Sequence, residues 1–188
     1  MKMDITPKDK VFKTAARLFY QHGYRAIGVD TIAAESGIGK MTLYRHYPSK
    51  DDLIVAYLRD SNELFWKNFE QITKDASTPR EKLLAFFQSL QDYVKTPVCY
   101  GCPFLNVATE YPETDYPGHQ VALEHKQSVR TRFRQLAKEA GAPKPEALAD
   151  QLFLLMDGAY MASRMFGAKN PAAQVAEAAR ILIDSAIG

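Results

Sequence analysis

Apolar residues recur every three or four positions along almost the whole chain, the spacing that places side chains on one face of an α-helix. The first stripe follows a proline at the usual first helical position and ends before a glycine; its members are Val11, Ala15, Leu18 and Phe19. No convincing run of alternating β-branched residues indicates a strand. The pattern therefore predicts an all-α protein.

Caps, prolines and glycines predict where about nine helices begin and end. We expect helices over residues 7–22, 29–36, 40–47, 50–72, 79–94, part of 103–118, 118–140, 145–166 and 171–187. A capping side chain precedes four of them, at Thr6, Ser49, Thr78 and Asn170. Pro112 and Pro117 interrupt the stretch before the long seventh helix.

The chain has 188 residues, 46% of them hydrophobic, which is enough to bury a core as one domain or as two small ones. It has no run of about 18 apolar residues and no basic segment followed by an apolar one at its start, so we expect a cytoplasmic protein without a membrane partner. Two cysteines, Cys99 and Cys102, are too few for a disulfide framework and fit a reducing compartment.

Positive charge is concentrated near the N-terminus. Residues 1–50 hold nine Lys and Arg against four Asp and Glu, a net charge of +5, whereas residues 51–188 hold fifteen against eighteen, a net charge of −3. The whole chain carries a net charge of +2. The first quarter is thus the part that would attract a polyanion.

The stretch from Gly37 to Lys50, GIGKMTLYRHYPSK, has the layout of a helix-turn-helix, because two short predicted helices are joined by a turn with glycine. Leu43 and Tyr47 are four residues apart and should pack inward. The opposite face then presents Lys40, Met41, Thr42, Tyr44, Arg45 and His46. Such side chains can donate to guanine or phosphate oxygens and touch a thymine methyl group, so the face suits DNA.

The span from Val11 to Leu58 closely resembles the DNA-binding domain of the TetR family of transcriptional regulators. The matching motifs are A-x-x-L-F before H-G-Y, then V-D-T-I-A, G-I-G-K-M-T-L-Y-R-H-Y and P-S-K-D-D-L. The resemblance implies base-edge contacts from Lys40, Met41, Thr42 and Arg45, and DNA-backbone contacts from Tyr44, His46 and Lys50. Many family members have Thr-Ser or Ser-Thr where this chain has Ile27-Gly28, so we expect no contact from that turn.

The resemblance also implies a three-helix DNA-binding domain at residues 1–50 and a helical ligand-binding and dimerisation bundle at residues 51–188. Aromatic residues between the bundle helices could line a ligand cavity. The candidate ligand-binding residues are Phe86, Tyr93, Phe104, Asn106, Glu110, Tyr111, Phe133 and Tyr160. Small residues in the last two helices allow close packing, and the candidate dimer-interface residues are Leu148, Leu152, Leu155, Gly158, Ala159, Val175, Ala179, Leu182 and Ile183.

Other chemistries are less well supported by the residues. The order C-x2-C-x16-H-x5-H, from Cys99 to His125, has a longer middle gap than a zinc finger and contains prolines, and we predict no metal and no cofactor. No catalytic triad or carboxylate pair indicates an enzyme. Two alternatives stay open: a thiol-based redox or electrophile sensor or oxidoreductase that uses Cys99 and Cys102, and an interaction module whose basic head binds an acidic protein.

The sequence therefore predicts a ligand-responsive DNA-binding transcriptional regulator. It would act as a homodimeric repressor that binds a palindromic operator in double-stranded DNA and is released by a small-molecule effector.

Overall fold

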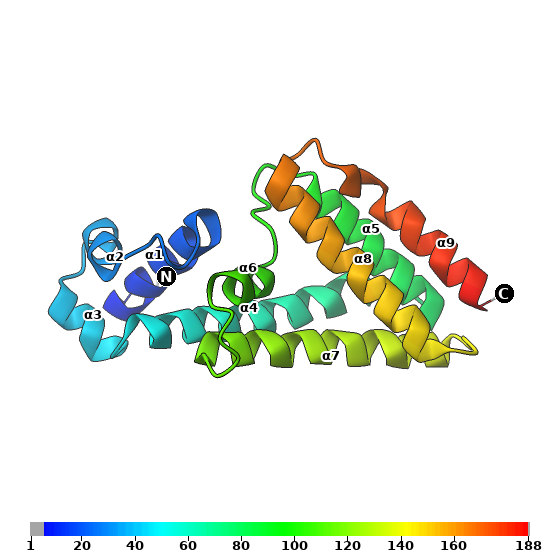
Figure 1. The fold of residues 1–188 in the computed structure, drawn as a ribbon, viewed down its shortest axis with the longest axis horizontal. Coiled ribbons are helices and arrows are strands. Elements are labelled where there is room, and N and C mark those ends of the chain that lie inside the picture. The colour runs from blue at the N-terminus through cyan, green and yellow to red at the C-terminus, as the bar shows by residue number, and fades with distance from the viewer. Residues whose placement is uncertain (1–5, 188) are drawn as a thin grey trace. The chain divides into compact units, whose positions relative to one another are not determined.

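The computed structural model describes residues 6–187, and within that range it contains nine α-helices, one short 3₁₀ turn and no strand. The helices are α1 (Pro7–His22), α2 (Val29–Ser36), α3 (Lys40–His46), α4 (Lys50–Thr73), α5 (Pro79–Val94), α6 (Pro103–Glu110), α7 (Pro117–Glu139), α8 (Pro145–Phe166) and α9 (Val175–Ile187), with the 3₁₀ turn η1 at Pro171–Gln174 (Figure 1). The all-α prediction is confirmed. No helix in the described range is both long and apolar enough to cross a membrane.

The predicted caps hold the helix ends. Thr6 and Thr78 each accept a hydrogen bond from the amide of the third helical residue, and an acidic side chain at that position, Asp9 or Glu81, accepts from the cap amide. The Ser49 hydroxyl accepts from the Asp52 amide at 3.0 Å. Asn170 accepts from Ala172 but opens a 3₁₀ turn, so the last α-helix starts four residues later than predicted.

The described chain forms two compact units. The head unit comprises the residues up to Asn62 together with Pro103–Leu123, and the bundle unit comprises Glu63–Cys102 together with the residues from Glu124 onward. α4 and α7 each contribute one part to either unit. The core of the head unit is built from α1 to α4 and contains Val11, Ala15, Leu18, Phe19, Ile32, Leu43, Leu53, Ile54 and Leu58.

In the head unit α6 is hydrogen-bonded to the turn that follows α1. The Tyr24 hydroxyl donates to the carbonyl of Pro103 at 2.9 Å, at the start of α6. The carboxylate of Glu110, at the end of α6, accepts from the amides of Tyr24 and Arg25 at 3.0 and 2.7 Å. Gly23 has φ +90°, and a Cβ there would lie 2.7 Å from Glu110 Oε1. Gly23 and Tyr24 of the H-G-Y motif thus form the surface to which α6 is bound.

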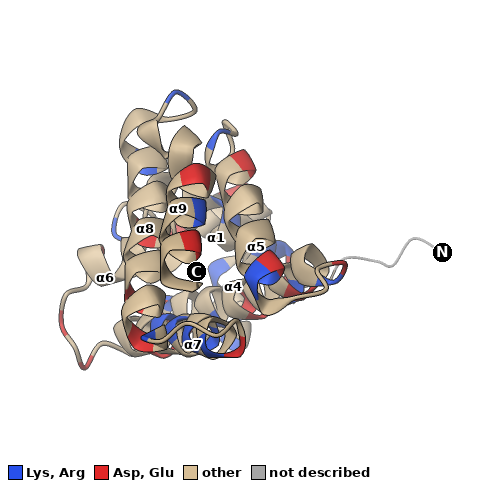
Figure 2. Cartoon of the chain, turned by 90° about the vertical axis from the view of Figure 1, so that its right-hand side faces the viewer, with Lys and Arg blue, Asp and Glu red and all other residues tan. Residues whose placement is uncertain are grey.

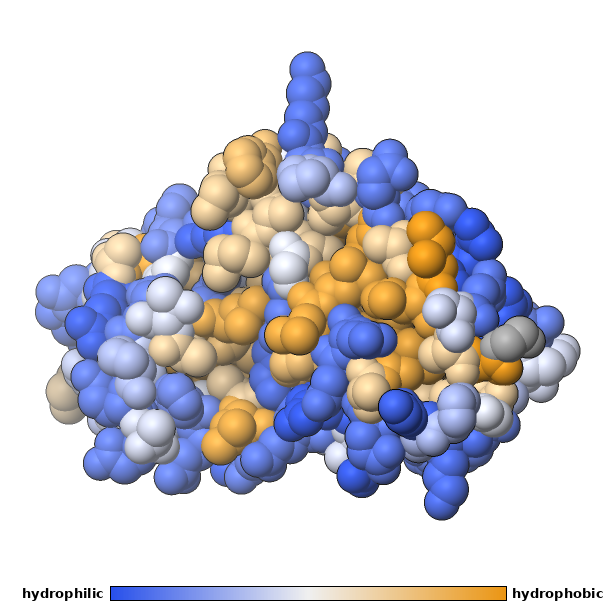
Figure 3. Space-filling view, turned by 45° about the vertical axis from the view of Figure 1, so that its right-hand side comes forward, coloured by the Kyte–Doolittle hydropathy of each residue, from blue (hydrophilic) through white to orange (hydrophobic). Residues whose placement is uncertain are grey.

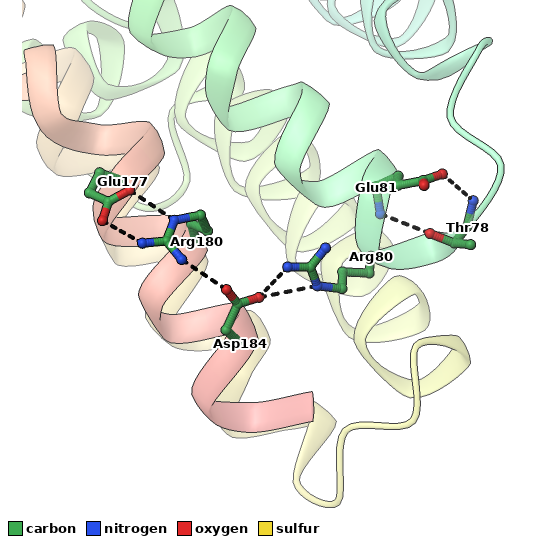
Figure 4. Close-up of polar contacts among 6 residues, drawn as sticks. All are labelled: Thr78, Arg80, Glu81, Glu177, Arg180 and Asp184. Carbon is green, nitrogen blue, oxygen red and sulfur yellow. Dashed lines mark hydrogen bonds and ion pairs between the residues drawn. The ribbon is translucent and has the colours of Figure 1, made fainter. Parts of the chain in front are cut away.

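In the bundle unit α5, α8 and α9 pack side by side (Figure 1). Acidic and basic positions are interspersed along α9 and α7, whereas much of α8 is uncharged (Figure 2). Arg80 on α5 donates twice to Asp184 on α9, at 3.1 and 2.5 Å, and Arg180 joins Asp184 to Glu177 (Figure 4). These ion pairs are partly exposed, and such pairs contribute little to stability beside the apolar contacts of the bundle core.

Candidate nucleic-acid interface

The helix-turn-helix is formed by α2, a three-residue turn and α3. Gly37 ends α2 in the left-handed conformation, with φ +68°, and its amide donates to carbonyls at the end of that helix. Leu43 of α3 and Ile32 of α2 are completely buried, and Tyr47 is only 7% exposed. The inward positions predicted from the sequence therefore fix the short α3 on the head-unit core.

The opposite face of α3 is open to solvent. Met41 is 87% exposed and Tyr44 is 45% exposed, Lys40 and Arg45 are also exposed, and Thr42 and His46 are half-buried. One short helix therefore presents two cations, two hydroxyl groups, an imidazole and a flexible thioether together. This combination can donate to base edges and phosphates and can contact thymine methyl groups.

Lys40 is not free on this face. Its ammonium forms an ion pair with the carboxylate of Asp30, in the first turn of α2. The hydrogen bond to Asp30 raises the pKa of Lys40. Residue spacing did not predict this pair, although the V-D-T-I-A motif contains the aspartate.

Lys50 begins α4 and is half-buried, whereas Lys40 and Arg45 of α3 are exposed. Burial lowers the pKa of Lys50, while the carboxylates of Asp51 and Glu110 oppose the shift and Arg25 adds to it. Lys50 belongs to the same head unit as these charged residues.

The eight candidate ligand-binding residues divide equally between the two units. In the bundle unit, Phe86 and Phe133 are buried with ring centroids 5.3 Å apart, and the Tyr93 and Tyr160 rings lie 6.4 Å apart. Phe104, Asn106, Glu110 and Tyr111 belong to the head unit.

Two of the head-unit candidates make contacts that the sequence did not indicate. The Glu110 carboxylate is engaged by backbone amides after α1, and the Tyr111 ring stacks on Tyr116 at 4.2 Å, with the Arg25 guanidinium 4.8 Å from its centroid. Both residues therefore hold the head unit together, and a ligand would have to compete with these contacts.

The nine candidate dimer residues lie mostly inside the protomer. Six of them are at most 4% exposed and belong to the bundle core: Leu148, Leu152, Ala159, Val175, Ala179 and Ile183. Leu155, Gly158 and Leu182 retain accessible surface. Periodicity therefore selected mainly the face of α8 and α9 that packs on the protomer's own core.

A different set of apolar residues is exposed on these helices. Leu154 and Met165 are each 69% exposed, Ile181 is 55% exposed and Met161 is 39% exposed. Leu154 also lines a groove of about 270 Å³ between α8, η1 and α9, together with Gly158, Ala162 and Ala178 among others. Figure 3 shows hydrophobic side chains gathered on the face that carries α8 and α9.

Both cysteines are buried in the bundle unit. Cys99 and Cys102 are 6% and 5% exposed, and neither forms a disulfide. The Cys99 carbonyl accepts from the buried Ser163 hydroxyl at 3.3 Å. Shielding from solvent disfavours a role in which these thiols meet an oxidant or electrophile.

A helix-turn-helix whose inner face is buried and whose second helix presents an open polar face, joined to a helical bundle, defines a helix-turn-helix DNA-binding regulator. Two family models match the chain: bacterial regulatory proteins of the tetR family over residues 11–57, and the tetracyclin repressor-like C-terminal domain over residues 79–179. The chain belongs to the TetR family and is a transcriptional regulator. The resemblance found at residues 11–58 is thereby confirmed and extends into the bundle.

Individual relatives agree with this assignment. The HTH-type transcriptional regulator YxaF of Bacillus subtilis is 26% identical over 180 residues, covering 94% of each chain. SCO4454, a TetR-family transcriptional regulator of Streptomyces coelicolor, has a structure that superposes with a TM-score of 0.87 and 29% identity, over 96% of this chain and 94% of that one. The regulator sav143 of Streptomyces avermitilis gives 0.86 and 30% identity, over 96% and 98% of the two chains.

Proposed function

We propose that the protein is a homodimeric repressor that binds a palindromic operator and is released by a small-molecule effector. The observation that carries this proposal is the outward face of α3, where Lys40, Met41, Tyr44 and Arg45 are exposed together while Leu43 anchors the helix. Met41, 87% exposed, and Tyr44, 45% exposed, leave much of their surface unpacked in the protomer. That surface suits contact with a groove of DNA.

The side chains suggest how the groove would be read. Arg45 can form two parallel hydrogen bonds with the O6 and N7 atoms of guanine, and Met41 and Thr42 can contact a thymine methyl group. The Tyr44 hydroxyl, His46 and Lys50 would contact phosphates, which fix the register without reading sequence.

Dimerisation would provide the affinity that one small head lacks. Two heads related by a two-fold axis would place their α3 helices in successive major grooves, about 34–36 Å apart, and would therefore select a palindrome. Formation of dimers is typical of TetR-family regulators. We assign the interface in this protein to the exposed apolar face of α8 and α9, including Leu154, Gly158, Met161, Ala162 and Ile181.

The effector would act through linkage between two sites. We assign DNA binding to residues 1–50 and effector binding and dimerisation to residues 51–188, with the aromatic residues of α5, α7 and α8 as candidate effector contacts. An effector that prefers the DNA-incompetent conformation by about 1.4 kcal/mol weakens operator binding tenfold. Operator DNA must then weaken effector binding by the same factor.

The test is selection of bound sequences from a random duplex library at a fixed salt concentration, because phosphate contacts make affinity salt-dependent. We expect a palindrome with two half-sites. Arg45→Ala should lose about 10- to 100-fold in affinity for the selected operator and should discriminate less at one base pair of each half-site.

Arg134→Ala is the matched control, because Arg134 is an exposed cation on α7 outside the head unit. It removes the same charge and should leave operator affinity close to that of the unsubstituted protein. If the library returns no preferred sequence, or if both variants bind alike, the proposed role of α3 is wrong.

A further inference from the structure

The ion pair between Asp30 and Lys40 crosses the turn of the helix-turn-helix. It joins the first turn of α2 to the first residue of α3. The two side chains are 77% and 55% exposed, so the pair lies in solvent, where such pairs contribute about 0–1 kcal/mol to stability. The pair therefore affects mainly the binding of a partner to this surface and has little effect on folding stability.

The pair lies at the end of α3 that meets base edges in a helix-turn-helix. Met41, the next residue, is the most exposed large apolar side chain in the described structure, at 87%. A carboxylate at this position is repelled by phosphates. It also occupies one of the three N–H donors of the Lys40 ammonium.

We propose that Asp30 is a specificity-determining residue that positions Lys40 for a base edge and withholds it from phosphates. This inference rests on the proposed function. Two N–H donors of Lys40 remain available while Asp30 holds the third, which is enough for the O6 and N7 atoms of a guanine. Movement of Lys40 to a phosphate would either break the pair or draw the carboxylate toward a like charge.

Asp30 should therefore lower the affinity for random DNA more than the affinity for the operator. Binding to random DNA depends almost entirely on phosphate contacts, so a withheld cation weakens it directly. Binding to the operator keeps Lys40 in use. Asp30 would thus lower the affinity for competing sites and raise the ratio of specific to non-specific binding, which is selectivity achieved by disfavouring the wrong partner.

The experiment measures fluorescence anisotropy with the selected operator and with a random duplex of equal length, over a salt series. Asp30→Asn should strengthen binding to the random duplex by about 3- to 10-fold and should steepen the slope of log K against log salt by about 0.9, the value for one further phosphate contact. Operator affinity should rise less, so the ratio of the two affinities should fall. Asp30→Glu should restore most of that ratio.

Two controls separate positioning from net charge. Asp115→Asn changes the charge equally at an exposed site in the loop between α6 and α7. Lys40→Met, alone and combined with Asp30→Asn, completes a double-mutant cycle. Asp30→Asn should raise the affinity for the random duplex more than Asp115→Asn does. This increase should disappear in the Lys40→Met background. Circular dichroism confirms that each variant is folded.

The outcomes are distinct. If Asp30→Asn behaves like Asp115→Asn, or if its gain persists in the Lys40→Met background, Asp30 does not act through Lys40 and the inference is overturned. If the unsubstituted protein itself shows no preference for any sequence, the proposed function fails, and the inference fails with it.

Discussion

Gly23 is the residue at which two local requirements coincide. Its φ of +90° disfavours any side chain, and a Cβ at this position would lie only 2.7 Å from a carboxylate oxygen of Glu110. Gly37 also has a positive φ, +68°, but no atom lies within 4 Å of its Cβ position. The backbone conformations also differ: Gly23 has ψ 168°, in a region that essentially only glycine adopts, whereas Gly37 has ψ 19°, in the left-handed helical region, so a side chain at residue 23 carries the larger backbone cost as well.

Gly23→Ala should lower the free energy of unfolding by about 2–4 kcal/mol, because strain is added to the displacement of Glu110 from the amides of Tyr24 and Arg25. Gly37→Ala should cost about 1–2 kcal/mol from strain alone. Urea unfolding followed by far-UV circular dichroism measures both. If Gly23→Ala costs no more than Gly37→Ala, neither the backbone conformation of Gly23 nor its contact with Glu110 contributes as argued.

His125 makes the bundle unit sensitive to acid. It is 4% exposed, its ring lies edge-on to Phe65 at 4.9 Å, and burial, with a smaller contribution from Lys126, lowers its pKa to about 3. In the unfolded chain a histidine has a pKa of about 6.5. Between these values the unfolded state binds the additional proton, so stability falls as the pH falls from about 6.5 toward 3.

The unfolding free energy should decrease by about 2 kcal/mol between pH 7 and pH 5 on account of this group. His125→Asn should remove that part of the pH dependence, whatever its cost at neutral pH. Fluorescence of Trp66, whose ring is 5.2 Å from Phe65, reports unfolding of the same unit. Parallel stability curves for the two proteins would show that His125 does not titrate on unfolding.

Local signals predicted the helices well. The bounds of α2 and α8 match the predicted ranges, and the caps at Thr6 and Thr78 form as expected, because a cap and a proline act within one turn. The outward face of α3 was predictable for the same reason: the motif contains both its anchor, Leu43, and its polar positions.

Contacts between elements that are far apart in the sequence could not be predicted from local motifs. Glu110 joins the turn after α1 from more than eighty residues away, and Asp30 meets Lys40 across a turn whose geometry the sequence does not state. The dimer candidates illustrate a related limit of periodicity. α8 is apolar on two faces, and spacing alone does not tell which face covers the protomer's own core. Leu152, on the core face, is 0% exposed, whereas Leu154 is 69% exposed.

At the scale of the whole molecule, the proposed operator reading depends on pairing two protomers through α8 and α9. Leu154 is a suitable probe, because it lines the groove and its exposure means that a polar replacement does not disturb the core. Leu154→Lys would place a charge in a desolvated, apolar contact in the dimer but in solvent in the monomer. The substitution should therefore shift the equilibrium toward the monomer.

Sedimentation at micromolar concentration should show dissociation of the Leu154→Lys variant. Its operator affinity should fall by at least tenfold, since a single head makes only half of the contacts. Leu64→Lys is the control, because Leu64 on α4 is 54% exposed and lies outside the groove. It introduces the same charge and should remain dimeric. If both variants stay dimeric and bind the operator alike, the two-fold contact lies on another surface, and the spacing of the half-sites must be explained from that surface instead.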